Sequence, residues 1–157
     1  MGKQKTLKAW DAINGASGTC YAVIDGEQHD MIYLKKISAK VTKSKSEIKV
    51  LGSTATKHKA NGWSGTGTAE MYYVTSMFRK MMVEYIKTGK DLYFDLHIIN
   101  EDPSSEIGKQ HIWLKQVNID EISVGELDIN STELSEEINF TFNDVDIMNK
   151  FDEPIGE

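Results

Sequence analysis

The stretch GTGTAEMYYVTSMFRKMMVEYIKTG, residues 65–89, decides the fold. Its Thr-rich and aromatic first part, residues 65–74, is typical of a β-strand. Thr75 or Ser76 then offers a hydroxyl to cap a helix, and Gly89 suits the left-handed conformation that ends one. A helix is therefore expected at about residues 76–88, with five apolar side chains at helical spacing on one packed face: Phe78, Met81, Met82, Tyr85 and Ile86. A single amphipathic helix needs a partner surface, and the rest of the chain supplies strands.

Strand patterns dominate the remaining sequence. Residues 19–24 alternate, and the hairpin dipeptide Asp25-Gly26 follows them. Further strands are expected at residues 30–34, 37–51, 92–99, 109–117 and 137–144. A polar N-terminal arm (residues 1–16), a long polar loop (52–64) and a C-terminal tail (148–157) complete the chain. We predict a mainly β fold, a β-barrel or sandwich with one flanking α-helix, in a single domain over residues 1–157.

The composition is that of an ordinary globular protein. The chain has 157 residues, of which 39% are hydrophobic and 27% charged. It contains no apolar run of the roughly 18 residues that a membrane helix needs, and no apolar signal region at the start. We therefore expect no membrane partner and synthesis inside the cell. The one cysteine, Cys20, excludes an intrachain disulfide.

The net charge of −6 is unevenly distributed. Residues 1–60 have 11 lysines against 5 acidic residues, whereas residues 61–157 have 7 basic against 19 acidic residues. Between Gln116 and Asn149 there are nine acidic residues and no Lys or Arg. This asymmetry fits a basic region for nucleic acid, a subunit whose two ends attract each other head to tail, or two separately solvated surfaces.

No set of residues predicts catalysis or a bound cofactor. His97 and His111 are expected to face each other across a hairpin, with Asp95 on the same face, but no third ligand completes a metal site. Cys20 lies in no recognisable catalytic motif. Residues 128–132 resemble the start of a calcium loop but lack its glycine. We predict a protein that is not an enzyme and has no catalytic, metal or cofactor residues.

An ordered series of short motifs over residues 13–147 resembles the tail tube proteins of contractile phages, specifically the PBSX-like defective-prophage family. The motifs are Asp25-Gly26, Lys45-Ser46-Glu47, His58-Lys59, Gly65-Thr66-Gly67-Thr68, Tyr73-Val74-Thr75-Ser76 with Phe78, Tyr93-Phe94 with Leu96, Leu127-Asp128, Glu133-Leu134 with Glu136-Glu137, and Phe140-Thr141-Phe142 with Asp144. The resemblance implies a structural protein with a fold similar to the tube protein of type VI secretion.

The same resemblance implies hexameric rings that stack into the inner tube of a contractile tail. Such a tube is a conduit for DNA, which passes without specific binding, or the piercing rod of an R-type bacteriocin. The implied partners are the tail sheath, baseplate or initiator, and tape-measure proteins. The implied site of synthesis is the bacterial host cytoplasm, followed by assembly into the tail of the particle.

Two surfaces follow if the chain builds such a tube. A polar strand face is expected to line the lumen, through Lys40, Thr42, Thr66, Thr68 and Glu70. The basic loop is expected to become ordered between stacked rings, through Lys57, His58, Lys59, Asn61 and Trp63. Two other functions stay open: a nucleic-acid-binding β-domain that uses the N-terminal lysines, and a small enzyme or binder built on a closed barrel.

Overall fold

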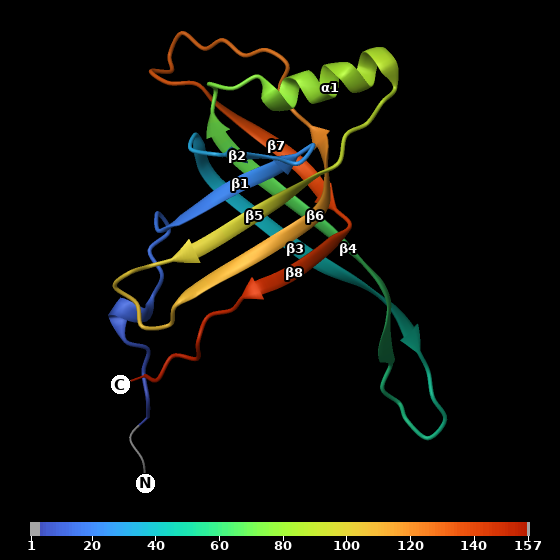
Figure 1. Ribbon diagram of the computed structural model, residues 1–157. Helices are drawn as coiled ribbons and strands as arrows, with labels where there is room; N and C mark the ends of the chain where they lie inside the picture. The colour runs from blue at the N-terminus through green and yellow to red at the C-terminus, as the bar shows by residue number, and fades with distance from the viewer. Residues whose placement is uncertain (1–3, 157) are drawn as a thin grey trace. The chain divides into compact units, whose positions relative to one another are not determined.

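The computed structural model describes residues 4–156 and is mostly β-structure with one α-helix (Figure 1). A short 3₁₀ helix, η1 (Ala9–Asp11), comes first, and the α-helix, α1 (Met77–Thr88), lies in the middle of the chain. The strands are β1 (Gly18–Ile24), β2 (Glu27–Asp30), β3 (Leu34–Ile48), β4 (Lys57–Tyr72), β5 (Phe94–Glu101), β6 (Lys109–Glu121), β7 (Ser135–Phe142) and β8 (Asp144–Asn149). Within residues 4–156, no helix has both the length and the apolar character needed to cross a membrane.

The chain forms two compact units, each built from separate segments. The first unit comprises Met1–Ile32, Tyr93–Gln116 and Asp144–Glu157, and the second comprises Tyr33–Leu92 and Val117–Asn143. Strand β6 contributes to both, and Gln116, the last residue of its first part, has a positive φ of 54°. The strand order β2-β1-β5-β6-β7-β4-β3 is an open path, with β8 paired to β6. The predicted mainly β fold with one helix is confirmed, but as an open sheet.

In the first unit, β1 pairs with β2 and β5, and the first part of β6 pairs with β8. The Asp25-Gly26 turn is confirmed, because both residues have positive φ, 52° and 81°. Alternation along each strand places the buried apolar residues on one face: Cys20, Ala22, Ile24, Phe94, Leu96 and Leu114. The face opposite this core is polar and aromatic.

Two buried carboxylates fix the N-terminal segment of the first unit. Asp11 accepts hydrogen bonds from the Glu106 backbone N–H (3.1 Å) and the Ser105 hydroxyl (3.3 Å). Asp102 accepts bonds from the Ser104 hydroxyl (2.7 Å) and the Asn14 backbone N–H (3.0 Å). These bonds to Ser104 and Asn14 lower the pKa of Asp102. Part of the predicted arm is therefore anchored, while residues 1–3 of the arm and residue 157 of the tail lie outside the described residues.

In the second unit, the long strands β3 and β4 form an antiparallel hairpin, and β4 also pairs with β7. The buried face comprises alternate residues of the two central strands: Gly65, Gly67, Ala69 and Met71 of β4, with Ile138, Phe140 and Phe142 of β7. A Cβ atom at Gly65 would lie 2.3 Å from the Phe142 ring, and one at Gly67 would lie 2.4 Å from the Phe140 ring. The GTGT stretch therefore has glycines where β4 leaves room for two phenylalanine rings.

Several predicted boundaries are wrong. The polar loop predicted at residues 52–64 is shorter, because Lys57 to Ser64 belong to β4 and pair with β3. The tail predicted at 148–157 begins later, because Met148 and Asn149 belong to β8. The second strand is β2 at Glu27–Asp30 and not residues 30–34. Residues 4–156 form eight strands, where about seven were expected, and the single domain stays a prediction.

Candidate assembly surfaces

The observed register places the five residues predicted to line a lumen on one face of the second unit. Lys40 pairs with Thr66, Ser38 with Thr68, and Lys36 with Glu70 across the β3–β4 hairpin. Because cross-strand partners share a face and alternate residues repeat it, Thr42 lies on this face too. Strand β7 extends the face, since Thr66 pairs with Thr141. We call this surface the polar face: Ser38, Lys40, Thr42, Thr66, Thr68 and Glu70, with Glu137, Asn139 and Thr141.

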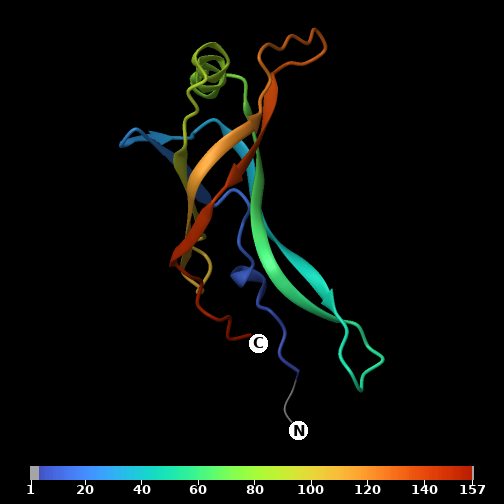
Figure 2. The ribbon, with the colours of Figure 1, turned by 90° about the vertical axis from the view of Figure 1, so that its right-hand side faces the viewer.

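The β3–β4 hairpin continues well beyond the strand that supports it. Pairing of β4 with β7 stops at Gly65, whereas pairing with β3 continues to Lys57 (Figures 1 and 2). The distal part is thus a two-stranded ribbon, and such ribbons are only marginally stable alone in water. It has exposed apolar residues on both strands and in the turn: Ile48, Val50, Leu51 and Trp63. We call residues 43–59 the ribbon tip.

The five residues predicted for an inter-ring loop therefore belong to a strand. Lys57, His58 and Lys59 pair with Ile48, Glu47 and Ser46 of β3. Asn61 is the unpaired residue at the bulge where the register shifts between Ser44 and Lys45. Trp63 is 47% exposed, and its ring lies 6.5 Å from that of Phe142, centre to centre. The turn itself comprises only residues 49–56, between the two strands.

Helix α1 is confirmed within one residue of its predicted bounds, and its caps follow the sequence. Ser76 occupies the N-cap position, but its side chain forms no capping hydrogen bond. The first helical N–H, that of Met77, donates instead to the Thr75 Oγ1 (3.3 Å). Gly89 ends the helix with φ 74°, and its N–H donates to the Tyr85 carbonyl (2.8 Å).

The predicted apolar helix face is only partly buried. Phe78 is buried and Met81 and Met82 are half-buried, but Tyr85 is 48% and Ile86 64% exposed. The five side chains are thus not all buried within the single chain, and packing of this face in the core or at a subunit interface stays a prediction. The reason is that α1 has only a narrow contact with the rest of its unit.

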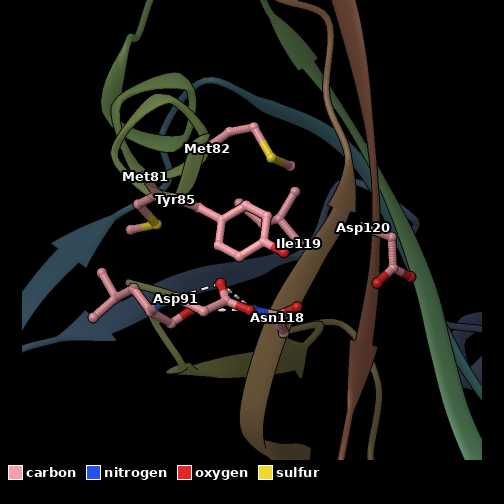
Figure 3. Close-up of a pocket in the computed structure, with 8 residues that line it drawn as sticks. Met81, Met82, Tyr85, Asp91, Asn118, Ile119 and Asp120 are labelled. Atoms are coloured by element: carbon pink, nitrogen blue, oxygen red, sulfur yellow. Dashed lines mark hydrogen bonds between the residues drawn. The ribbon is translucent and has the colours of Figure 1, made fainter. Parts of the chain in front are cut away.

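A groove of about 270 Å³ lies between α1 and the end of β6. Figure 3 shows Met82, Tyr85 and Ile119 directed toward one another across it. At its lower edge in that view, the Asn118 amide donates to the Asp91 carboxylate over 2.8 Å. The groove is lined by Met81, Met82, Tyr85, Asp91, Leu92, Asn118, Ile119 and Asp120. Its walls combine apolar side chains with the polar groups of Asp91, Asn118 and Asp120 in nearly equal measure.

An ion pair that the sequence analysis did not predict attaches α1 to β7. The Arg79 guanidinium contacts the Glu136 carboxylate and the Thr75 carbonyl, and it lies 4.3 Å from the Tyr73 ring centre. The side chains of Arg79 and Glu136 are 12% and 1% exposed. Burial raises the pKa of Glu136, and Arg79 opposes that shift. One signal was present: Arg79 is the only arginine in a chain with 17 lysines.

In the first unit, an aromatic and imidazole cluster occupies the face opposite the core. His97 Nδ1 lies 2.8 Å from His111 Nε2, which confirms the predicted juxtaposition. The Tyr21 ring stacks on His97 at 4.5 Å, and Trp113 stacks on the same imidazole at 5.4 Å. Burial and the nearby His111 lower the pKa of His97. No group of three His, Cys, Asp or Glu within residues 4–156 is arranged to hold a metal ion.

Cys20 is buried among apolar residues of the first unit. Its Sγ lies 3.8 Å from the Met31 sulfur, and burial raises its pKa to about 12. The thiol therefore stays protonated at neutral pH and is a poor nucleophile.

The family model for "Phage tail tube protein" matches residues 5–149. The chain belongs to the phage tail tube protein family. It is 42% identical over 144 residues to the phage-like element PBSX protein XkdM of Bacillus subtilis (strain 168), over 92% of this chain and 95% of that protein. The predicted family and its structural, tail-tube character are thereby confirmed, and its members are structural proteins.

Two solved structures share the tail tube fold. One is a chain of the six-fold symmetrised anti-feeding prophage baseplate, with a TM-score of 0.66 at 12% identity over 95% of this chain and 98% of that one. The other is a chain of the sheath/tube terminator of an extracellular contractile injection system in its extended state, with a TM-score of 0.64 at 12% identity over 87% and 96%. At this identity the likeness concerns the fold alone.

Proposed function

We propose that this tail tube protein assembles into six-membered rings that stack as the inner tube of a contractile tail. The observation that carries the proposal is the β3–β4 ribbon, which extends past β7 with exposed apolar residues on both strands. Within residues 4–156, no third strand pairs with this part of the hairpin. A two-stranded ribbon of this kind becomes more stable when a neighbouring chain covers its exposed apolar residues. The edge strands β2 and β3 each have one hydrogen-bonded neighbour, which leaves edges for pairing between copies.

Tube geometry needs two kinds of contact. A ring uses a heterologous interface that closes after a fixed number of copies, and stacking uses one that stays open and makes a filament. The six-fold symmetry and the sheath/tube assembly named for the two structural neighbours support this arrangement. Sheath, baseplate or initiator, and tape-measure proteins are the proposed partners, in a particle made in the bacterial cytoplasm.

The polar face is proposed to line the lumen. Its hydroxyl, amide and mixed charged groups stay hydrated and present no run of positive charge to phosphates, so DNA would slide past without being held. On β4 and β7 the opposite face, which contains Phe140 and Phe142, is buried. The lumen would serve DNA passage in a phage, or be the core of a piercing rod in a bacteriocin.

The test is electron microscopy of the purified full-length protein, together with sedimentation across a range of concentrations. Rings with six subunits, and tubes above a threshold concentration, are the expected results. A variant with a shortened hairpin provides a second test. It replaces residues 49–56 by Asn-Gly, which closes the hairpin directly because Ile48 and Lys57 are already cross-strand partners. This variant should fold and form rings but not long tubes. A wild-type protein that stays monomeric at every concentration, without rings, would overturn the proposal.

A further inference from the structure

The second unit has two exposed apolar patches of opposite charge. The ribbon tip has five lysines around the fully exposed Leu51 and the partly exposed Val50: Lys43, Lys45, Lys49, Lys57 and Lys59. Residues 122–134, which we call the acidic loop, have three acidic residues and no lysine or arginine. In this loop Leu127 and Ile129 are almost fully exposed, and Val124 is 66% exposed.

Most of these charges face solvent, although the Asp128 carboxylate accepts a hydrogen bond from the Asn130 backbone N–H (3.0 Å). In residues 4–156, none of the five tip lysines and none of Glu126, Asp128 and Glu133 has an ion-pair partner. Exposed leucine and isoleucine side chains beside unpaired charges are typical of a surface that a partner of opposite charge covers.

The two patches lie at opposite ends of the same strand. Tyr72, the last residue of β4, pairs with Ser135, and the Tyr73 N–H donates to the Leu134 carbonyl (2.9 Å) where the acidic loop ends. The ribbon tip lies at the other end of β4, a strand of 16 residues. At about 3.3 Å per residue the separation is about 50 Å. Figures 1 and 2 both show the tip and the loop at opposite ends of the unit.

We propose that the ribbon tip of one copy docks on the acidic loop of the next copy. This inference rests on the proposed tube and names the stacking contact within it. Because the two patches are different and lie at opposite ends, the contact is heterologous and repeats without closing, which is the geometry of a stack. Leu51 and Val50 pack against Leu127 and Ile129, and the lysines pair with the surrounding carboxylates.

The proposed contact is tested by reversing the charges on each patch separately and then on both patches together. The tip-reversed variant has Lys49→Glu with Lys57→Glu, and the loop-reversed variant has Glu126→Lys with Asp128→Lys. Each should lower the fraction of protein recovered as tubes by at least about tenfold, because like charges then face each other. The variant with all four substitutions restores opposite charges and should recover tubes to within about threefold of wild type. The matched control, Lys57→Arg with Asp128→Glu, keeps the charges and should assemble normally.

A second measurement detects the contact directly. Leu51→Cys and Leu127→Cys proteins are mixed, assembled and oxidised, and a disulfide-linked dimer is expected in tubes but not at concentrations below assembly. Cys20 does not interfere, because its thiol is buried.

The outcomes separate this inference from the proposed function. Normal tubes from the tip-reversed or loop-reversed variant, or failure of the four-fold variant to recover, would overturn the docking while leaving the tube intact. A tip that binds DNA, with tubes unaffected by its reversal, would also overturn it. A wild-type protein without rings or tubes would contradict the proposed function itself.

Discussion

Replacing Arg79 by alanine removes the cation that compensates the Glu136 carboxylate, which is 1% exposed. Removing one partner of a buried ion pair costs about 3–5 kcal/mol, because the other charge stays buried without compensation. The change also removes the Arg79 contacts with the Thr75 carbonyl and the Tyr73 ring. For a chain of this size, the melting temperature should fall by about 6–20 °C.

The assay is urea unfolding of dilute, unassembled protein, followed by circular dichroism. Lys80→Ala is the matched control, since Lys80 is the neighbouring exposed residue of the same helix and should change stability by less than about 0.5 kcal/mol. Replacing both partners, as Arg79→Met with Glu136→Leu, should recover most of the loss. A cost for Arg79→Ala that matches the Lys80→Ala control would refute the assigned role of this ion pair.

The pH dependence of this prediction follows from the raised pKa of Glu136. A carboxyl group whose pKa is raised in the folded state stabilises the fold at pH values below the pKa of the unfolded state. This stabilisation is lost as the pH rises through the pKa of the folded state. Without Arg79 the pKa of Glu136 rises further, because the guanidinium that favours the charged carboxylate is gone. The deficit of Arg79→Ala relative to wild type should therefore shrink as the pH falls and Glu136 becomes protonated.

Three further predictions concern single sites. Gly67→Ala should destabilise the protein by about 1–3 kcal/mol in the same unfolding assay, because its Cβ would overlap the Phe140 ring; an unchanged midpoint would contradict the packing. The pKa of His97 is lowered in the folded protein, so its neutral imidazole stabilises the fold at pH values above the ordinary histidine pKa. This stabilisation is lost as the pH falls through the pKa of the folded state. The free energy of unfolding should therefore decrease between pH 7 and 5, and should decrease less in His97→Gln. Cys20→Ala should assemble normally, and the native thiol should react with maleimide far more slowly than in unfolded protein; fast labelling would show that Cys20 is accessible.

The parts of the fold with strong periodicity were predictable. The helix, the Asp25-Gly26 turn and the apposition of His97 with His111 follow from local spacing and from turn residues. The polar strand Lys57–Ser64 was missed because its residues neither alternate nor favour strands; its structure comes from pairing with β3. Strand β8 was missed because it follows β7 after Asn143 alone, with no turn signal between them.

The candidate surfaces were predictable only in part, because local periodicity shows which residues share a face but not what that face contacts. Alternation placed the polar residues Lys40 and Thr66 on one face, and the register confirmed that they are neighbours. Helical periodicity identified Tyr85 and Ile86 as part of an apolar face, but periodicity does not say what covers that face. The Arg79–Glu136 pair joins residues 57 positions apart, and no local pattern encodes such a contact.

The central claim is that this chain builds a tube with the polar face inside. A helical reconstruction by cryo-electron microscopy of tubes grown from the purified protein tests it most directly. We expect six copies per ring, with Lys40, Thr66 and Thr68 lining the lumen. Tubes in which this face is buried between subunits, or turned to the outside, would contradict the account.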